Sequence, residues 1–549
     1  MHLSTTLTLL LVLCLSVRAQ TTLSPEQWQQ DLKFLQHTVH QDYPFLFKKT
    51  TAEDFDRQID ELHQAIPNLQ DHQIRVGFAK VVSSFQYGHT SLWLGAKDHG
   101  FHQMPFNLYQ FSDGIYVQGV HKKYPNALAA KVLKVEDKPV DEVLKAIRPV
   151  VPAENDQFFK AHGYGYLGSP EVLHAQGVTA SLKTTVTLTL EKNGKTFDQI
   201  FEHMDLEENP LTYSMLLEKD PWIEARDTNE TPLWLKHLDR VYYYEYLPQQ
   251  KAVYVRHSRI RNEENESIED FYGKVFEFIE NNEVERLILD YRLNGGGNNY
   301  LNKPIITGIL GCDKINQSGK LFVILGRRTY SACQNLVNEI DNYTQAIFVG
   351  EPTAENINFY GDNRKVELPH SKMVVRLSFA WWQDKPQWEN APWLAPDIAV
   401  DMSFTDYRTN HDPVLQAVWE YDPASPIHDP ITYFTSLYDT GRQQEILPEA
   451  KKMVNDPRYR YYPFENQFNQ IGYKLLGGQQ FEPALFVFQL NAELFPESAN
   501  VWDSLAEGLW KSGQIDKAKA LYHKVIDMDP EGSLGQNAKE MLLQIKDSH

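Results

Sequence analysis

One apolar run in the middle of the chain restricts the fold more than any other feature. Residues 287–290 read Leu-Ile-Leu-Asp, and Asn294 and three consecutive glycines follow closely. A short continuous apolar run bounded by turn residues is typical of a strand buried inside a sheet. The segment therefore predicts a sheet covered by other elements, with a glycine-rich loop at the end of one of its strands.

The stretch 206–425 around this run alternates strand and helix patterns. The expected strands are 252–255, 287–290, 321–325 and 346–349, and the expected helices are 268–279 and 335–341. Strands that alternate with helices of this length are typical of an α/β layer. We therefore predict a core in 206–425 with a partly parallel sheet.

The part of the chain before this core divides into two patterns. Residues 20–97 are mostly helical, and Ser24 followed by Pro25 is a typical helix start. Residues 98–205 are rich in strand-like runs bounded by turn residues. Those runs are 114–117, 130–135 and 184–190, with a short helix expected at 140–147. We predict an N-terminal helical segment followed by a compact β domain.

Residues 464–549 repeat with a period of 34. Gly472, Ala484, Phe488 and Pro496 recur as Ala506, Ala518, Tyr522 and Pro530. Small residues let two helices approach closely, the aromatic residue packs between them, and proline ends the second helix. The pattern predicts a pair of tetratricopeptide repeats joined by a linker at 426–463. Such a pair either docks on the neighbouring domain or binds a protein partner.

The first nineteen residues look like an export signal. Residues 7–17 form an apolar run too short to span a bilayer, and a small residue, Ala19, follows. This is the pattern of a signal peptide, 1–19, cleaved after Ala19. The alternatives are a buried N-terminal helix and a lipid anchor at Cys14. We predict export, to the exterior or to a periplasm.

Composition excludes several classes of function. Lys and Arg total 53 against 73 Asp and Glu, a net charge of −20, which disfavours nucleic-acid binding. Apolar runs are shorter than the roughly 18 residues of a membrane-spanning helix. Cysteine and histidine spacings fit no structural zinc site, and no His-Glu-x-x-His motif is present. We expect neither a metal nor a cofactor.

Three strand ends carry candidate functional residues. The glycines at 295–297 can leave backbone N–H groups free for an oxyanion. Ser331 follows the strand 321–325 at a strand-to-helix junction, either as an exposed nucleophile or as a helix cap. Residues 350–353 end a third strand and lead to a polar loop. Active sites of α/β sheets are built from strand ends of this kind.

In this order, the motifs resemble the tail-specific (C-terminal processing) serine peptidases, whose clan includes the tricorn core protease and the interphotoreceptor retinoid-binding repeats. The resemblance covers roughly residues 75–422. It rests on Gly88-His89-Thr90, Asn294-Gly295-Gly296-Gly297, Thr329-Tyr330-Ser331-Ala332, Gly350-Glu351-Pro352-Thr353, Pro396-Asp397-Ile398 and Asp412-Pro413-Val414-Leu415. It implies an α/β peptidase core with a PDZ-like β domain, 98–205, inserted into it.

The resemblance also implies roles for individual residues. Ser331 matches the nucleophile, which would form an acyl-enzyme with peptide substrates. The backbone N–H groups of Gly296 and Ala332 would form the oxyanion hole. The better-known members use a lysine base shortly after the Gly-Glu-x-Thr turn, but here the next lysine is Lys365.

His89 is the best replacement for the missing lysine, because an imidazole with a pKa near 6.5 suits general-base catalysis. Glu351, Glu355 and Asp362 are candidate acids to orient it, and the sequence does not choose among them. His89 as a structural turn residue is the alternative. The missing lysine also motivates a second hypothesis, an inactive peptidase-fold protein that binds a peptide, a small ligand or a partner protein.

Overall fold

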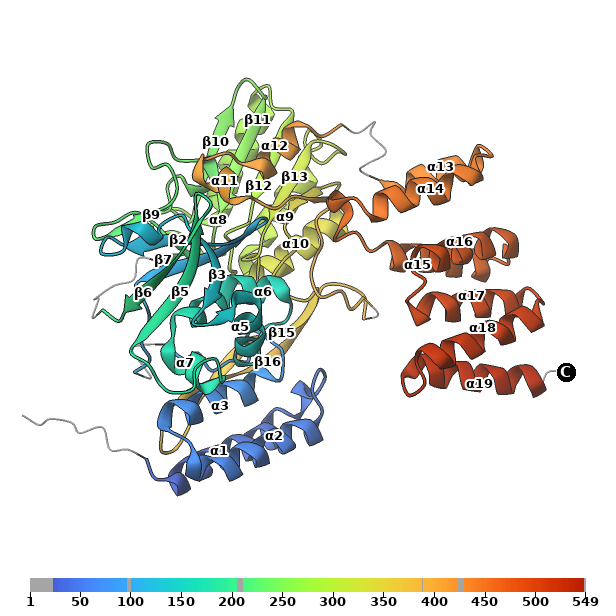
Figure 1. The fold of residues 1–549 in the computed structure, drawn as a ribbon. Helices are drawn as coiled ribbons and strands as arrows, with labels where there is room; N and C mark the ends of the chain where they lie inside the picture. The colour runs from blue at the N-terminus through green and yellow to red at the C-terminus, as the bar shows by residue number, and fades with distance from the viewer. Residues whose placement is uncertain (1–22, 96–99, 205–210, 388, 423–428, 548–549) are drawn as a thin grey trace, which may run out of the picture.

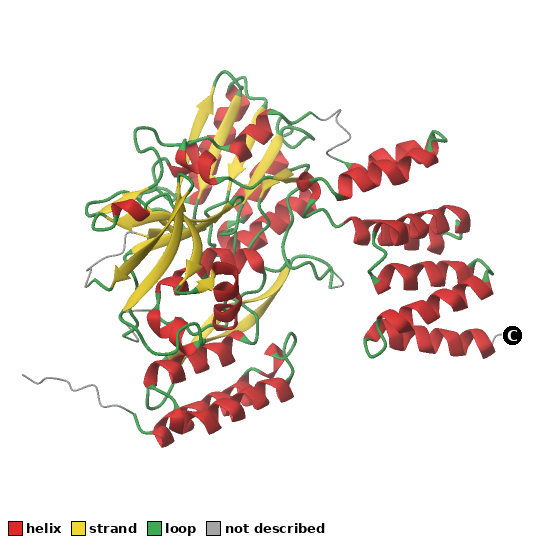
Figure 2. Cartoon of the chain, viewed as in Figure 1, coloured by secondary structure: helices red, strands yellow, loops and turns green. Residues whose placement is uncertain are grey.

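The computed structural model describes residues 23–95, 100–204, 211–387, 389–422 and 429–547. The predicted signal peptide, 1–19, lies outside the described residues. Within these residues, helices come first, two large sheets follow, and a row of helices comes last (Figure 1, Figure 2).

The N-terminal segment is helical, as predicted. Its helices are α1 (Pro25–Asp42), α2 (Ala52–Ala65) and α3 (Asp71–Ser83). Ser24 caps α1 by accepting the Gln27 N–H, and the Gln27 side chain accepts the Ser24 N–H in return. After α3, Ser91 forms an isolated antiparallel β-bridge with Arg376.

The segment after these helices forms an antiparallel sheet in the order β1-β2-β3-β5-β6. Its strands are β1 (Phe106–Phe111), β2 (Gly114–His121), β3 (Lys131–Val135), β4 (Lys138–Pro139), β5 (Thr185–Lys192), β6 (Lys195–Glu202) and β9 (Trp222–Glu224). Short helices, α5 (Val140–Ile147), α6 (Asp156–His162) and α7 (Pro170–Ala175), accompany it, and β7 (Leu211–Thr212) pairs with β8 (Met215–Leu216). The expected strands and the 140–147 helix are therefore present.

The core sheet has the order β10-β11-β12-β13-β14-β17, and every pair except β10 with β11 is parallel. Its strands are β10 (Tyr242–Leu247), β11 (Ala252–His257), β12 (Arg286–Asp290), β13 (Leu321–Leu325), β14 (Ile347–Gly350) and β17 (Ile398–Ala399). The prediction of an α/β fold with a partly parallel sheet is confirmed.

Helices cover both faces of this sheet. Leu287 and Leu289 of β12 pack with α8 (Ile268–Asn281), α9 (Lys303–Gly311) and α10 (Ala332–Tyr343). Ile288, between them, packs on the other face with α12 (Pro413–Trp419). Alternate side chains of a strand point to opposite faces, so a strand covered on both sides is apolar throughout.

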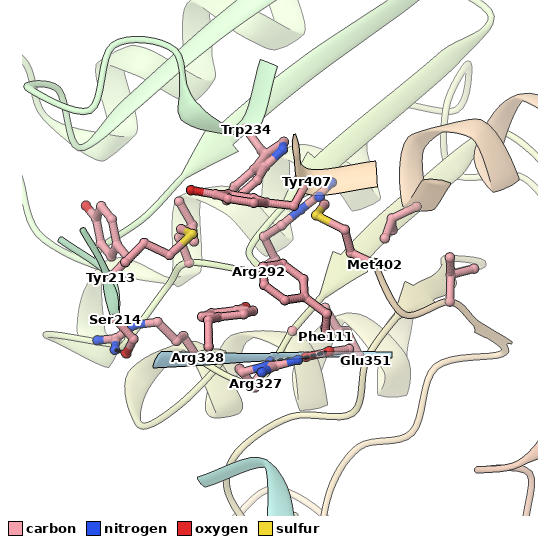
Figure 3. Close-up of a pocket in the computed structure, with 17 residues that line it drawn as sticks. Phe111, Tyr213, Ser214, Trp234, Arg292, Arg327, Arg328, Glu351, Met402 and Tyr407 are labelled. Atoms are coloured by element: carbon pink, nitrogen blue, oxygen red, sulfur yellow. Dashed lines mark hydrogen bonds and ion pairs between the residues drawn. The ribbon is translucent and has the colours of Figure 1, made fainter. Parts of the chain in front are cut away.

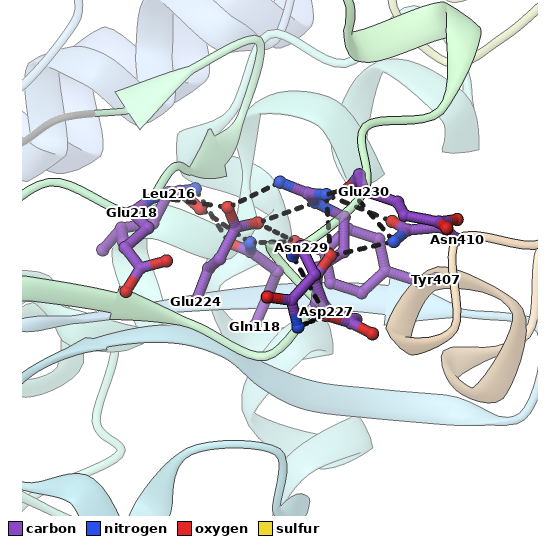
Figure 4. A network of polar contacts seen from close by, with 10 residues as sticks. Gln118, Leu216, Glu218, Glu224, Asp227, Asn229, Glu230, Tyr407 and Asn410 are labelled. Carbon is purple, nitrogen blue, oxygen red and sulfur yellow. Dashed lines mark hydrogen bonds and ion pairs between the residues drawn. The ribbon is translucent and has the colours of Figure 1, made fainter.

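A buried polar network joins the antiparallel sheet to the end of the core (Figure 4). Glu224 of β9 accepts a hydrogen bond from the Tyr407 hydroxyl of α11 (Phe404–Arg408) at 2.9 Å. Gln118 of β2 donates to the same hydroxyl, and Arg226 pairs with Glu224 at 3.0 Å. Because each buried polar group has a partner, the network fixes how the two sheets meet.

A long hairpin, β15 (Asn358–Glu367) with β16 (Val374–Gln383), leaves the core after β14. The Thr90 hydroxyl lies 2.8 Å from the Ser378 hydroxyl and also accepts the Ser378 N–H. These bonds hold the Gly88-His89-Thr90 turn against the hairpin.

The chain ends in helices packed side by side (Figure 1). They are α13 (Pro430–Asp439), α14 (Gln443–Val454), α15 (Phe464–Gly477), α16 (Phe481–Leu494), α17 (Ala499–Lys511), α18 (Ile515–Met528) and α19 (Ser533–Asp547). A Cβ on Gly472 would lie 2.4 Å from the Phe488 ring, so a small residue is needed there. The 426–463 segment, expected as a linker, holds α13 and α14, whose buried Phe434 and Ile446 form an apolar cluster.

Candidate active site

Ser331 lies where β13 passes into α10, which begins at Ala332. Its backbone has φ 59° and ψ −130°, a conformation that non-glycine residues rarely adopt and that costs about 1–3 kcal/mol. The side chain makes no capping hydrogen bond to the helix. Ser331 therefore occupies the N-cap position of α10 without capping the helix through its side chain, and its hydroxyl is available for another role.

The glycine loop after β12 packs directly on Ser331. A Cβ on Gly296, whose φ is 85°, would lie 2.6 Å from the Ser331 Cβ and 2.8 Å from the Ala332 nitrogen. Glycine at this position keeps open the space in front of the Ala332 N–H. Within the described residues, that N–H has no hydrogen-bond acceptor.

The predicted oxyanion hole needs one correction. The Gly296 N–H donates to the Asn294 side-chain oxygen at 2.9 Å, so it is not a free donor. The asparagine that precedes the glycines satisfies this N–H by folding back on its own loop, as asparagine commonly does in turns. Ala332 supplies a free N–H, and Gly296 contributes space.

Glu355 brings Ser331 and His89 to one carboxyl group. One of its oxygens accepts the Ser331 backbone N–H, and the other lies 3.5 Å from His89 Nε2. Glu355 is fully buried, and the His89 side chain is 15 % exposed. The His89 ring also stacks on Tyr330, with ring centroids 4.9 Å apart. Of the three acids considered from the sequence, Glu355 is the one placed at His89.

The other two acids have different partners. Glu351 forms a buried ion pair with Arg327, whose Nε donates to it at 2.8 Å. Burial favours a higher pKa for Glu351, but the Arg327 charge and hydrogen bonds outweigh it and lower the pKa. Asp362 is exposed on β15 and accepts a hydrogen bond from Trp382 at 3.2 Å. The prediction that Glu351 or Asp362 orients His89 is therefore wrong.

Sequence reasoning missed a second buried carboxylate. Glu154 accepts the Gly88 N–H at 3.0 Å and a hydrogen bond from the Asn356 side chain at 2.7 Å. It therefore ties the turn that carries His89 to the loop that carries Glu355. Lys49 is nearby, donating to the Gln86 carbonyl at 3.0 Å, and its charge acts on Glu154. No motif surrounds Glu154 or Lys49 in the sequence.

Burial determines the protonation states of His89 and Glu355. It lowers the pKa of His89 to about 4, so the ring is neutral at neutral pH. Burial, with the neighbouring Glu154 carboxyl, raises the pKa of Glu355 well above its usual range. A neutral imidazole is the form that can accept a proton.

Comparisons with solved structures find proteins with a similar fold. Mature CPAF complexed with lactacystin aligns at 12 % identity with a TM-score of 0.50, covering 72 % of this chain and 97 % of that one. Mature CPAF aligns at 13 % identity, also with a TM-score of 0.50, covering 72 % and 96 %. The photosystem II D1 C-terminal processing protease aligns at 12 % identity with a TM-score of 0.31, covering 69 % and 94 %. No protein-family model and no curated protein matches the sequence.

At 12 % and 13 % identity, the two CPAF comparisons establish the fold alone. The chain has the tail-specific peptidase fold, as the resemblance in sequence implied. Within the described residues, no helix is long and apolar enough to cross a membrane. The same residues contain no group of three or more His, Cys, Asp or Glu side chains placed to hold a metal ion.

Proposed function

We propose that this protein is a serine peptidase that cleaves polypeptide substrates through an acyl-enzyme on Ser331. One observation carries the proposal: the Glu355 carboxyl contacts both the Ser331 backbone and the His89 ring. A nucleophile, a base and an acid that orients the base are the parts that serine-dependent acyl transfer requires.

In the proposed reaction, His89 takes the hydroxyl proton as Ser331 Oγ forms a bond to the peptide carbonyl carbon. The carbonyl oxygen becomes negatively charged, and the Ala332 N–H at the start of α10 donates to it. His89 then gives the proton to the leaving amine as the C–N bond breaks. Water, deprotonated by His89, attacks the ester, and Ser331 Oγ leaves with the proton.

Glu355 assists at the moment when His89 becomes charged. Its carboxylate is buried and poorly solvated, and it lies near the Glu154 carboxyl; both raise its pKa. An imidazolium 3.5 Å away supplies the missing opposite charge, so each ionised form stabilises the other. His89 replaces the family's lysine in this scheme, since Lys365 is exposed on β15.

Replacing Glu355 by glutamine tests this role. Glutamine can still accept the Ser331 N–H, but it carries no charge, so we expect kcat to fall by about 10²–10⁴-fold with little change in KM. Asp362→Asn, an exposed acid on the hairpin, is the control and should retain full activity. Equal kcat for Glu355→Gln and the unmodified protein would contradict the role.

The pH dependence tests the base. A general base acts only when unprotonated, and a lowered pKa keeps His89 unprotonated at lower pH. We expect kcat/KM for a quenched peptide to fall as the pH drops through about 4, well below the ordinary histidine value of 6.5. Circular dichroism at each pH separates titration from unfolding. An acid limb near 6.5 would contradict the buried neutral state of His89.

The proposal extends to the rest of the chain. Residues 1–19 direct export, 98–205 form a PDZ-like insertion, and 464–549 form a tetratricopeptide pair that docks on the peptidase or binds a protein partner. The helices α15 to α18 support the last assignment, because they form successive pairs over the stretch with the 34-residue period.

One observation favours the second candidate, an inactive binding protein. Among the described residues, no hydrogen bond joins the Ser331 hydroxyl to the His89 ring, and His89 Nε2 has no hydrogen-bond partner. The peptidase proposal accounts for this gap because catalytic hydrogen bonds often form only when substrate is bound. Turnover of any peptide, lost on replacing Ser331, separates them.

A further inference from the structure

A cavity of about 350 Å³ opens beside the proposed active site. His89, Tyr330 and Gly295 line it, so it borders the base, the residue before the nucleophile and the glycine loop. Trp93 and Phe158 supply apolar walls, with ring centroids 6.4 Å apart. A substrate side chain or chain end next to the cleaved bond would enter this space.

The charges that line the cavity are of one sign. Arg328 and Arg376 are among the lining residues, and no Asp or Glu is. His162 also lines it, and burial lowers the pKa of His162 to about 3, so the ring is neutral at neutral pH. In a chain with a net charge of −20, a pocket with two arginines and no acid is selective for an anion.

Arg328 has hydrogen-bonding capacity that the protein leaves unused. Its Nε is buried without a partner, while its Nη1 donates to the Ser214 hydroxyl. Its Nη2 lies 4.0 Å from the position a Cβ would take on Gly295, at the edge of the glycine loop. Figure 3 shows the contrast with the preceding residue: Arg327 lies beside Glu351, whereas Arg328 lies beside Ser214.

Neither arginine of the cavity has a carboxylate partner among the described residues. Arg376 belongs to β16, and its backbone pairs with Ser91, another lining residue. A buried guanidinium without a counter-ion is poorly solvated, and a carboxylate matches its donors in geometry as well as in charge. A ligand that carries a carboxylate would supply the partner that both arginines lack among the described residues.

We infer that the cavity binds a carboxylate of the peptide substrate beside the cleaved bond, through Arg328 and Arg376. The carboxylate belongs to an acidic side chain or to the C-terminus of the peptide. This inference rests on the proposed peptidase function, which it deepens by naming the substrate class.

The first experiment compares hydrolysis of quenched peptides that differ by one group. One pair, blocked at both ends, carries Glu or Gln at the same position, scanned along the peptide. The second pair carries Gln with a free or an amidated C-terminus. We expect about a tenfold or greater preference in kcat/KM for the carboxylate in one pair, which also identifies its source. No preference in either pair overturns the inference.

Variants of the two arginines link any preference to the cavity. Arg328→Gln and Arg376→Gln should remove the preference, whereas the charge-conserving Arg376→Lys should keep most of it. Arg364→Gln, an exposed arginine on the neighbouring strand of the same hairpin, is the matched control and should change nothing. A preference that survives both glutamine variants, with thermal unfolding unchanged, overturns the inference.

A binding measurement separates this inference from the proposed function. Ser331→Ala in the full chain should bind the carboxylate peptide more tightly than its neutral partner, as followed by fluorescence anisotropy of labelled peptides. If the unmodified protein hydrolyses no peptide but this binding difference is present, the cavity inference stands and the peptidase proposal fails. If hydrolysis occurs and both peptides bind equally, the peptidase proposal stands and the inference is overturned.

Discussion

Replacing Ser331 by alanine is expected to lower kcat for peptide hydrolysis by about 10⁵–10⁶-fold, to the background rate. The change removes the atom that forms the acyl-enzyme, and neither the base nor the oxyanion donor can replace it. The fold should persist, because the hydroxyl does not cap α10 and alanine can adopt the same backbone. Steady-state hydrolysis of a quenched peptide measures the loss of kcat, and thermal unfolding checks that the variant is folded.

The neighbouring thiol provides a control for the nucleophile. Cys333 is fully buried in α10, and burial raises the pKa of its thiol well above the usual range. It is therefore inert as a nucleophile, and Cys333→Ala should keep its activity. Hydrolysis that survives in Ser331→Ala but disappears in Cys333→Ala would contradict the assignment.

Replacing His89 by alanine is expected to have the second-largest effect, a fall in kcat of about 10⁴-fold or more. The ring takes the serine proton and returns it to the leaving amine, so both steps lose their proton carrier. The same peptide assay measures the loss. Added imidazole should restore part of the rate by occupying the space left beside Glu355.

His411→Ala is the matched control, since His411 is an exposed histidine paired with Asp406. It should leave kcat unchanged. If His89 were only a structural turn residue, imidazole would not rescue the variant, and loss of activity would follow loss of folding.

The α/β core could be predicted from sequence because its signals are local. Residues 287–289 are all apolar, as a strand covered on both faces requires, and Ser331 stands at a strand-to-helix junction. The helix expected at 335–341, which the structure extends to 332–343, and the partly parallel sheet follow from the same alternation of patterns. When burial of one face of a helix or strand determines which residues are apolar, the resulting hydrophobic pattern can be read directly from the sequence.

The partners within the site could not be predicted in this way. The contact of His89 with Glu355, and the bonds of Glu154 to Gly88 and Asn356, join residues far apart in sequence, and only tertiary packing creates them. The choice among Glu351, Glu355 and Asp362 depends on two facts that the sequence does not show. Glu351 is ion-paired with Arg327, and Asp362 is exposed. The Gly296 N–H was misjudged because an asparagine side chain two residues earlier occupies it.

Covalent labelling tests the central claim, an activated Ser331, most directly. A fluorophosphonate probe reacts with a serine hydroxyl only where a base and an oxyanion site activate it. Intact mass spectrometry of the treated protein, followed by peptide mapping, should find one adduct, located on Ser331 and absent from Ser331→Ala. An unlabelled protein, or an adduct on another residue, would contradict the account.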